Sequence, residues 1–184
     1  MNYPLINLYH LYNLEMFAQG YCDGLQHSST PAPKQSQNLG YNPSHAKTML
    51  ITTFPLIDKD GVFFSQKSSQ MLQDMIFKVL NLSLCECAIF SLYKSQELLN
   101  PHDMQKYKEI LFAQILQSPA RCGLIFGLEE IAIPLFPKYS LSIGSSLNFK
   151  GKKLLITHSL KALIRLENLK KQTFQDLKNL KALL

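Results

Sequence analysis

The basic residues gather at the C-terminal end of the chain, where they could bind a polyanion. Residues 138–184 contain ten of the nineteen Lys and Arg residues and only two acids, Glu167 and Asp176. Residues 1–137 contain nine basic and eleven acidic residues, so the positive excess lies in the last quarter of the chain. A nucleic acid would be attracted to that end with an affinity that falls as the salt concentration rises. A solvated helix face rich in lysine would have the same composition, so charge alone leaves both interpretations open.

The cysteines do not have the spacing of a metal site. They are Cys22, Cys85, Cys87 and Cys122. None of them forms the C-x-x-C pair that is typical of zinc sites and iron–sulfur clusters. Cys85 and Cys87 are one residue apart in an expected strand, which would place both side chains on one face. The sequence therefore favours buried, reduced thiols and predicts no metal site.

Length and hydropathy suit one domain of ordinary size with additional segments. The chain has 184 residues, of which 46% are apolar, and its mean hydropathy is −0.03. No long uncharged apolar run is present, so a membrane span is not expected. The N-terminus lacks the basic flank and small-residue cleavage site of a secretory signal, which leaves the cytoplasm as the expected compartment.

The first 47 residues differ in composition from the rest. Leucine recurs at every third position from Leu5 to Leu14, and Gly20 is a plausible helix stop, so we expect a helix over residues 1–20. Residues 21–47 are rich in Ser, Pro, Gln and Asn, which predicts a flexible linker. The helix could dock on its own domain or on a partner protein.

Residues 48–184 form the expected folded domain, in which strand-like and helix-like segments alternate. The expected strands are 48–54, 86–93, 122–126 and 153–156. The expected helices are 68–82, 101–117 and 129–136, with a short apolar and a long basic amphipathic helix between Thr157 and Leu184. Such alternation predicts an α/β fold with a central, mainly parallel sheet of four strands.

A ligand site is expected where the parallel strands end, because α/β sheets bind ligands at the carboxyl ends of their strands. The segments that follow the expected strands are Thr52-Thr53-Phe54-Pro55, Ser91 to Ser95, Gly127-Leu128 and Thr157-His158-Ser159.

These segments, in this order, resemble the uracil-DNA glycosylase superfamily, most of all its bacterial and archaeal iron–sulfur branch. The run G-V-F-F-S-Q-K-S-S-Q-M-L-Q-D-M-I, residues 61–76, is similar to the family's G-x-P-F-x-G-x-A-G-x-L-L-x-x-M-L. The run I-F-G at 125–127 is similar to a strand that ends in L-G. The segment 157–177 is similar to T-Y-H-P-S-x-L-L-R-x-P-x-x-K-x-x-x-W-x-D-L. The residues in step with that motif are Ala162, Leu163, Arg165, Lys170, Phe174, Asp176 and Leu177. The resemblance covers about residues 48–178 and implies a three-layer αβα fold.

The chain replaces several residues that the resemblance would make catalytic. The family's water-activating carboxylate falls on Thr53, whose hydroxyl is a poor general base at neutral pH. Asp58 and Asp60 follow closely and are either substitutes for it or solvated loop acids. The Asn that reads uracil aligns with Ser91, whose single hydroxyl would discriminate bases less well. A cluster cysteine aligns with Ser95 and the N-terminal C-x-x-C is absent, so we expect no iron–sulfur cluster.

The closing motif allows two positions for the family's catalytic His. Without a gap it falls on Ser159, and with a one-residue deletion it falls on His158. A His at this place would stabilise the negative charge that builds on the departing uracil. The family Phe that stacks on the flipped base is matched by Phe63-Phe64, unless these rings belong to the core.

The resemblance, combined with these replacements, implies a catalytically degenerate protein that acts in DNA replication or repair by binding DNA or a partner protein. The expected DNA contacts are Lys152, Lys153, Lys161 and Arg165. The psi subunit of the bacterial polymerase III clamp loader, a small protein of similar fold that acts through protein contacts, is a precedent that the resemblance implies. One alternative is an active, divergent glycosylase that uses His158 with Asp58 or Asp60. Another is an interaction module whose basic helix binds an acidic protein without nucleic acid.

Overall fold

The computed structural model describes residues 40–94 and 104–184. The predicted N-terminal helix and residues 21–39 of the predicted linker lie outside the described residues. The described elements are β1 (Thr48–Thr52), α2 (Lys67–Asp74), η2 (Met75–Leu80), η3 (Leu84–Glu86), β2 (Cys87–Ser91), α3 (Met104–Gln117), β3 (Cys122–Phe126), η5 (Leu128–Ala132), α4 (Ile133–Leu135), β4 (Ser146–Phe149), β5 (Lys152–Thr157), α5 (Leu160–Arg165), η6 (Glu167–Leu169) and α6 (Lys170–Lys181).

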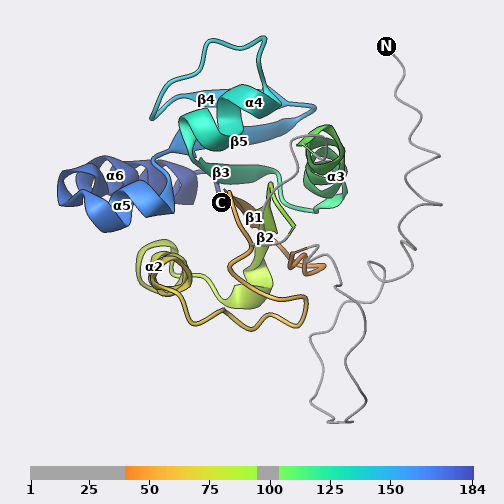
Figure 1. Cartoon of the computed structure of the whole chain (residues 1–184). Coiled ribbons are helices and arrows are strands. Elements are labelled where there is room, and N and C mark those ends of the chain that lie inside the picture. The colour runs from red at the N-terminus through yellow and green to blue at the C-terminus, as the bar shows by residue number, and fades with distance from the viewer. Residues whose placement is uncertain (1–39, 95–103) are drawn as a thin grey trace. The chain divides into compact units, whose positions relative to one another are not determined.

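A five-stranded, mostly parallel sheet organises these elements, in the order β2-β1-β3-β5-β4 (Figure 1). β1 pairs in parallel with β2 and β3, and β3 pairs in parallel with β5. Every residue of β1, β2 and β3 is buried. Parallel strands covered on both faces are typically continuous apolar runs, which is why these three strands are evident in the sequence. The predicted α/β class is confirmed.

The fifth strand, β4, shows that the predicted count of four strands was wrong. β4 pairs antiparallel with β5 through a two-residue turn at Lys150 and Gly151, whose φ angles are 50° and 83°. Two positive φ angles in such a turn match the twist of a hairpin. In β4, Leu147 is buried while Ser146 and Asn148 are exposed. This short, half-polar strand lacks the apolar run by which the other strands were predicted.

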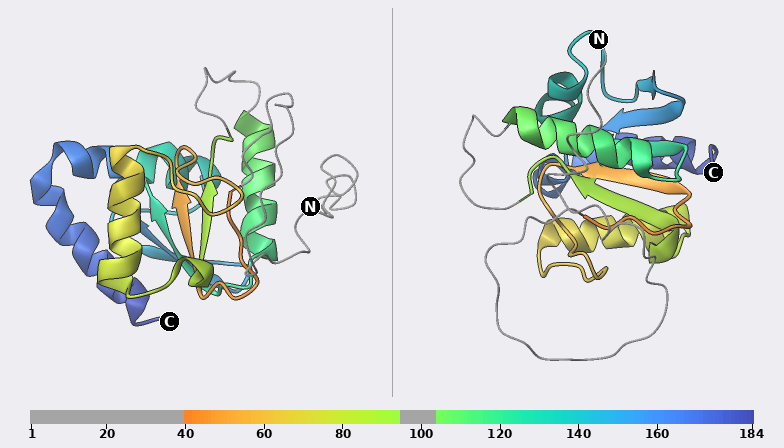
Figure 2. Two further views of the ribbon diagram at one scale, coloured as in Figure 1. Left: turned by 90° about the horizontal axis from the view of Figure 1, so that it is seen from below. Right: turned by 90° about the vertical axis from the view of Figure 1, so that its right-hand side faces the viewer.

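Helices cover both faces of the sheet, an arrangement compatible with the predicted three layers. On one face, Leu111 of α3 and Ile131 of η5 share a buried cluster with Phe90 of β2. On the other face, Leu72 of α2 and Leu177 of α6 belong to a second buried cluster. The left view of Figure 2 shows α3 on one side of the sheet and α2, α5 and α6 on the opposite side.

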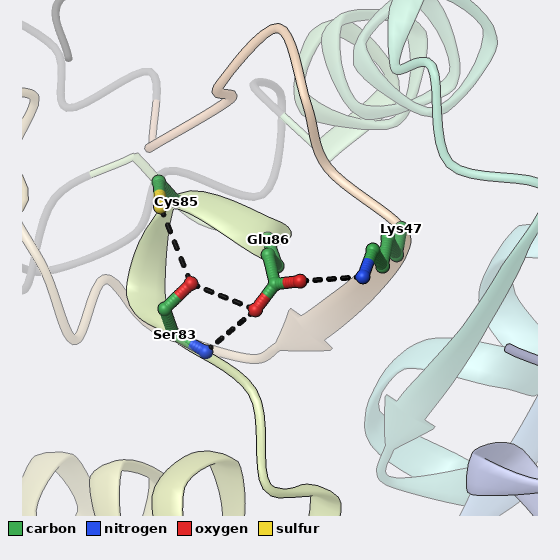
Figure 3. Close-up of polar contacts among 4 residues, drawn as sticks. All are labelled: Lys47, Ser83, Cys85 and Glu86. Atoms are coloured by element: carbon green, nitrogen blue, oxygen red, sulfur yellow. Dashed lines mark hydrogen bonds and ion pairs between the residues drawn. The ribbon is translucent and has the colours of Figure 1, made fainter.

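A polar cluster around Glu86 joins the amino ends of β1 and β2 (Figure 3). The Glu86 carboxylate lies 2.6 Å from Lys47 Nζ and accepts hydrogen bonds from the Ser83 N–H (2.9 Å) and hydroxyl (2.8 Å). The hydrogen bond from Lys47, followed by those from Ser83, lowers the pKa of Glu86 to about 2. Because Lys47 directly precedes β1 and Glu86 directly precedes β2, this cluster fixes where the two strands begin.

The last part of the predicted linker, residues 40–47, lies against the edge strand β2. The N–H of Tyr41 donates to the carbonyl of Ile89 at 2.9 Å, and the N–H of Ile89 donates back at 2.7 Å. Tyr41 also packs on the buried cluster beneath α2. These contacts cover part of an edge that would otherwise present unpaired backbone groups.

Candidate functional site

The carboxyl ends of the four parallel strands meet at one edge of the sheet, where the sequence predicts a ligand site. After β1 the chain passes through α2 and η2 to β2, which lies next to β1 on one side of the sheet. After β3, the next parallel strand is β5, which lies next to β3 in the opposite direction across the sheet. Connections that diverge between neighbouring strands open the crevice in which α/β proteins bind ligands. Three strands end there in a buried hydroxyl, at Thr52, Ser91 and Thr157.

Two of these hydroxyls are engaged within the turns that follow their strands. Ser91 Oγ donates to the carbonyl of Tyr93 at 2.7 Å. Thr52 Oγ1 lies 2.8 Å from the carbonyl of Phe54 and also contacts that of Phe90. A single hydroxyl has one proton to donate, so Ser91 has none left for a base edge while this hydrogen bond persists.

Aromatic rings cover the same end of β1 and β2. Phe54 is 40% exposed and stacks on Tyr93, with ring centroids 5.4 Å apart. Tyr93 in turn meets Tyr107 of α3 edge to face at 5.9 Å. The backbone N–H of Tyr93 donates to the carbonyl of Thr53, which holds the half-buried Thr53 beside the end of β2.

Lys94, which the sequence analysis did not select, is the most unusual group at this edge. Its side chain is 1% exposed, and its Nζ donates to the carbonyl of Ser91 and to Gln114 Oε1, at 2.7 Å from the latter. Burial lowers the pKa of Lys94 to about 7. The amine thereby joins the end of β2 to α3. Its one sequence signal is its place three residues after the last residue of the buried strand β2.

The two candidate acids lie in the loop after β1, and one of them stabilises that loop. Asp58 Oδ1 accepts hydrogen bonds from the N–H groups of Asp60 (2.9 Å) and Val62 (2.8 Å). Asp60 is exposed. The half-buried Phe63 forms an isolated bridge with Ile57 and packs on the buried cluster beneath α2. Phe64 is also half-buried. The structure therefore gives Asp58 and Phe63 local structural roles.

The last candidate segment begins α5. Ser159 is its N-cap, and its Oγ accepts a hydrogen bond from the N–H of Ala162 at 3.4 Å, a standard way to satisfy a helix start. His158 is half-buried. Within residues 40–94 and 104–184, no hydrogen bond or ion pair joins His158 to Asp58, Asp60 or Ser91. The predicted catalytic groups are thus not connected to one another, and Gly61, which follows Asp60, lies beside Leu84, ahead of β2 rather than after it.

A buried carboxylate holds α6 against the end of β5. Thr157 Oγ1 donates to Asp176 Oδ2 at 2.7 Å and lies 2.9 Å from Thr173 Oγ1. Gln172 Nε2 donates to the other oxygen of Asp176 at 3.0 Å. Asp176 is 1% exposed. Its role is therefore to position α6 rather than to act in a cleft.

The four expected DNA contacts do not form one surface. Lys152 and Lys153 begin β5, whereas Lys161 and Arg165 lie in α5 beyond its other end. A strand of this length separates the two pairs by roughly 20 Å. Lys152 Nζ also donates to the carbonyls that precede β3, at Ser118 (2.6 Å) and Ala120 (2.8 Å). Burial, followed by the charge of nearby Arg121, lowers its pKa.

A groove of about 400 Å³ lies between α2–η2 on one side and α5 and α6 on the other. We call it the α2–α6 groove. Its lining residues are Met71, Met75, Val79, Leu163, Lys170, Lys171, Thr173, Phe174 and Leu177. The sequence does not predict this groove, because its two walls are distant in the chain.

Lysines of α6 surround this groove. Lys178 Nζ lies 4.6 Å above the ring of Phe174, and Lys181 Nζ donates to the carbonyl of Val79 across the groove at 3.1 Å. Lys170 forms an exposed ion pair with Glu167 at 3.1 Å. For Lys171 no ion-pair partner is found among the described residues. The groove therefore combines an apolar floor with a basic rim.

Of the three cysteines within the described residues, two have buried thiols. Cys87 and Cys122 are buried, and burial raises the pKa of Cys87 to about 12. Cys85 lies in η3 rather than in β2, so it does not share a strand face with Cys87 as the sequence analysis expected. In the part of the chain that the structure describes, no three His, Cys, Asp or Glu side chains group as a metal site would require.

No protein family model and no curated protein matches the sequence of this chain. None of the described helices is long and apolar enough to cross a membrane.

Proposed function

We propose that this protein is a catalytically degenerate member of the uracil-DNA glycosylase-like fold that acts in DNA replication or repair by binding rather than by chemistry. The observation that supports the proposal is the type of side chain found at and after the carboxyl ends of the parallel strands. Thr53, Ser91 and, in the alignment without a gap, Ser159 hold hydroxyls where the family would place its polar groups, and the hydroxyls of Ser91 and Ser159 are engaged within the domain.

Excision of a base needs a group that activates water and groups that stabilise charge on the sugar and the leaving base. Thr53 cannot supply a carboxylate, and Asp58 uses one oxygen to close its own turn. The mostly parallel sheet, with closing helices packed beside β5, agrees with the resemblance without establishing it.

A second candidate, an active and divergent glycosylase, is favoured by one observation. His158 follows the end of β5, is half-buried, and has no hydrogen-bond partner in the described ranges 40–94 and 104–184, so its imidazole is available to a ligand. Uracil excision that depends on His158 would establish this alternative.

Salt-dependent DNA binding tests the proposed partner. Lys161 and Arg165 share α5, so replacing both with Gln should weaken binding of a DNA duplex. The slope of log K against the logarithm of the salt concentration should become shallower by about two. A matched Lys150→Gln, Lys153→Gln pair at the far end of β5 changes two exposed side chains, removes the same charge and should have a smaller effect on binding. Gel-shift titrations from about 50 to 200 mM salt measure both.

Two results would change this account. Equal losses in the two double variants would show that only net charge matters. If the protein showed no salt-dependent DNA binding, the remaining hypothesis would be an interaction module that binds an acidic protein and no nucleic acid.

A further inference from the structure

We propose that the α2–α6 groove binds an acidic, amphipathic helical segment of a partner protein. This inference deepens the proposed function and rests on its claim that the domain acts by binding, because it names the class of partner and the surface that receives it.

The floor of the groove is an apolar stripe that the domain leaves partly uncovered. Met71, Met75 and Val79 recur at every fourth position along α2 and η2, and all three are half-buried. Residues four apart share one face of a helix. Opposite them, Phe174 of α6 is 46% exposed although its ring lines the groove. Two helices that leave such a stripe between them are suited to accept the apolar face of a third.

The residue types in the floor suit a protein ligand. Methionine side chains are flexible and polarisable, and they adapt to the apolar face of a bound helix. The wall that carries Met75 is also π-helical, a geometry that recurs at functional sites.

The rim sets the charge of the partner. Lys170, Lys171, Lys178 and Lys181 all project from α6 around the groove. The nearby acids are few and occupied: Glu167 pairs with Lys170, and Asp74 pairs with Lys78. Asp176 points the other way, into the contact with β5. A partner with acidic residues beside its apolar face would be attracted by this rim and held by the floor.

A nucleic acid fits this surface less well. Phosphates would meet the lysines but would leave the methionine stripe uncovered. Bases bind single-strand sites by stacking on aromatic rings. Phe174 is the one aromatic ring in the lining, and Lys178 already lies over it.

The test uses the full chain and a labelled helical peptide of about 18 residues, with Leu at positions i, i+3, i+4 and i+7 and Glu on the flanks. The control peptide has the same composition, with the leucines spread around the helix. We expect saturable binding of the first peptide, measured by fluorescence anisotropy, and binding of the second that is at least about tenfold weaker. Equal binding of the two peptides would overturn the proposal, because charge alone would then account for it.

Point variants locate the site. Phe174→Ala and Lys171→Glu alter exposed side chains, so both should fold, and each should weaken the first peptide about five- to tenfold. Lys153→Glu makes the same charge change at the exposed start of β5 and should alter binding by less than about twofold. The proposal fails if both groove variants bind as the wild type does, or if Lys153→Glu loses as much as Lys171→Glu.

Two other possible occupants of the groove, a nucleic acid and a second copy of the chain, would each give a different experimental result. Displacement of the peptide by a single-stranded oligonucleotide, with the same loss in Phe174→Ala, would assign the groove to nucleic acid. A concentration-dependent dimer that Phe174→Ala dissociates would assign it to a second copy of the chain. Either result overturns the peptide proposal but leaves the non-catalytic function intact, because uracil excision is measured separately on the same preparations.

Discussion

Individual polar side chains decide what the carboxyl edge of the sheet can do. Ser91, Ser159 and Asp58 each occupy a place where a reactive group was expected, and each makes a local hydrogen bond instead. A side chain that satisfies its own turn is held in a fixed orientation and gives up its proton or lone pair. The His158 side chain has no such hydrogen bond within the described residues.

Lys94 gives the edge a measurable pH dependence. Its folded-state pKa of about 7 lies below its ordinary value of 10.5, so the unfolded chain binds more protons between these pH values. The free energy of unfolding contributed by this residue should therefore rise with pH, by at most about 1.4 kcal/mol per pH unit. Urea unfolding of the wild type and Lys94→Met at pH 7.0 and 8.5 measures the difference in slope.

The buried Cys87 limits the pH range over which that experiment reports on Lys94. Burial raises the pKa of Cys87 to about 12, so its titration makes stability fall with pH at higher values. That contribution is common to both proteins and cancels in the comparison. A slope that is the same in the wild type and in Lys94→Met would show that Lys94 is not the buried amine described here.

At the scale of elements, apolar periodicity predicted most of the fold. The runs at 48–54 and 122–126 became β1 and β3, and the stripe at 68–82 became α2 and η2. These segments are buried on one or both faces, so their pattern is set by the core. β4 was not predicted because only one of its four residues is buried, which leaves no apolar run. The Lys150-Gly151 turn was the clearer indication in the sequence of a hairpin at this place.

The candidate site was less predictable than the fold. The strand ends could be placed from the sequence because parallel strands finish at one edge. The engagement of Ser91 with Tyr93, and the burial of Lys94 against α3, depend on turn geometry and on contacts far apart in the chain. The α2–α6 groove needs both of its walls, which are about 100 residues apart and share no local signal.

The position of α6, and with it one wall of the groove, depends on Asp176. Asp176→Ala would remove the carboxylate that accepts hydrogen bonds from the buried Thr157 hydroxyl and from Gln172, so we expect a loss of about 2–4 kcal/mol in the free energy of unfolding. Asp74→Ala, which removes an exposed i,i+4 ion pair with Lys78, is the matched control and should cost about 0.5 kcal/mol or less.

Denaturant unfolding of both variants checks this prediction, and peptide binding by the groove provides a second readout. Similar losses in Asp176→Ala and Asp74→Ala would contradict the structural role assigned to Asp176. An intact groove in a strongly destabilised Asp176→Ala would show that α6 is positioned by its apolar contacts alone.

At the scale of the whole chain, charge and apolar surface are distributed unequally. The net charge of +6 comes entirely from residues 138–184, and six of their ten basic residues lie in the segment 160–184 that follows β5. The rim of the α2–α6 groove belongs to this segment, whereas Lys152 is engaged at the other end of β5. A positive field concentrated beside an apolar groove favours association with an acidic surface.

The central claim, that the domain binds without excising a base, is tested most directly by single-turnover uracil excision with the protein in excess over labelled single- and double-stranded DNA. We expect no abasic product from the wild type above the level of a no-protein control, and no difference between the wild type and His158→Ala. Excision by the wild type that His158→Ala abolishes would contradict the claim and identify His158 as a catalytic residue.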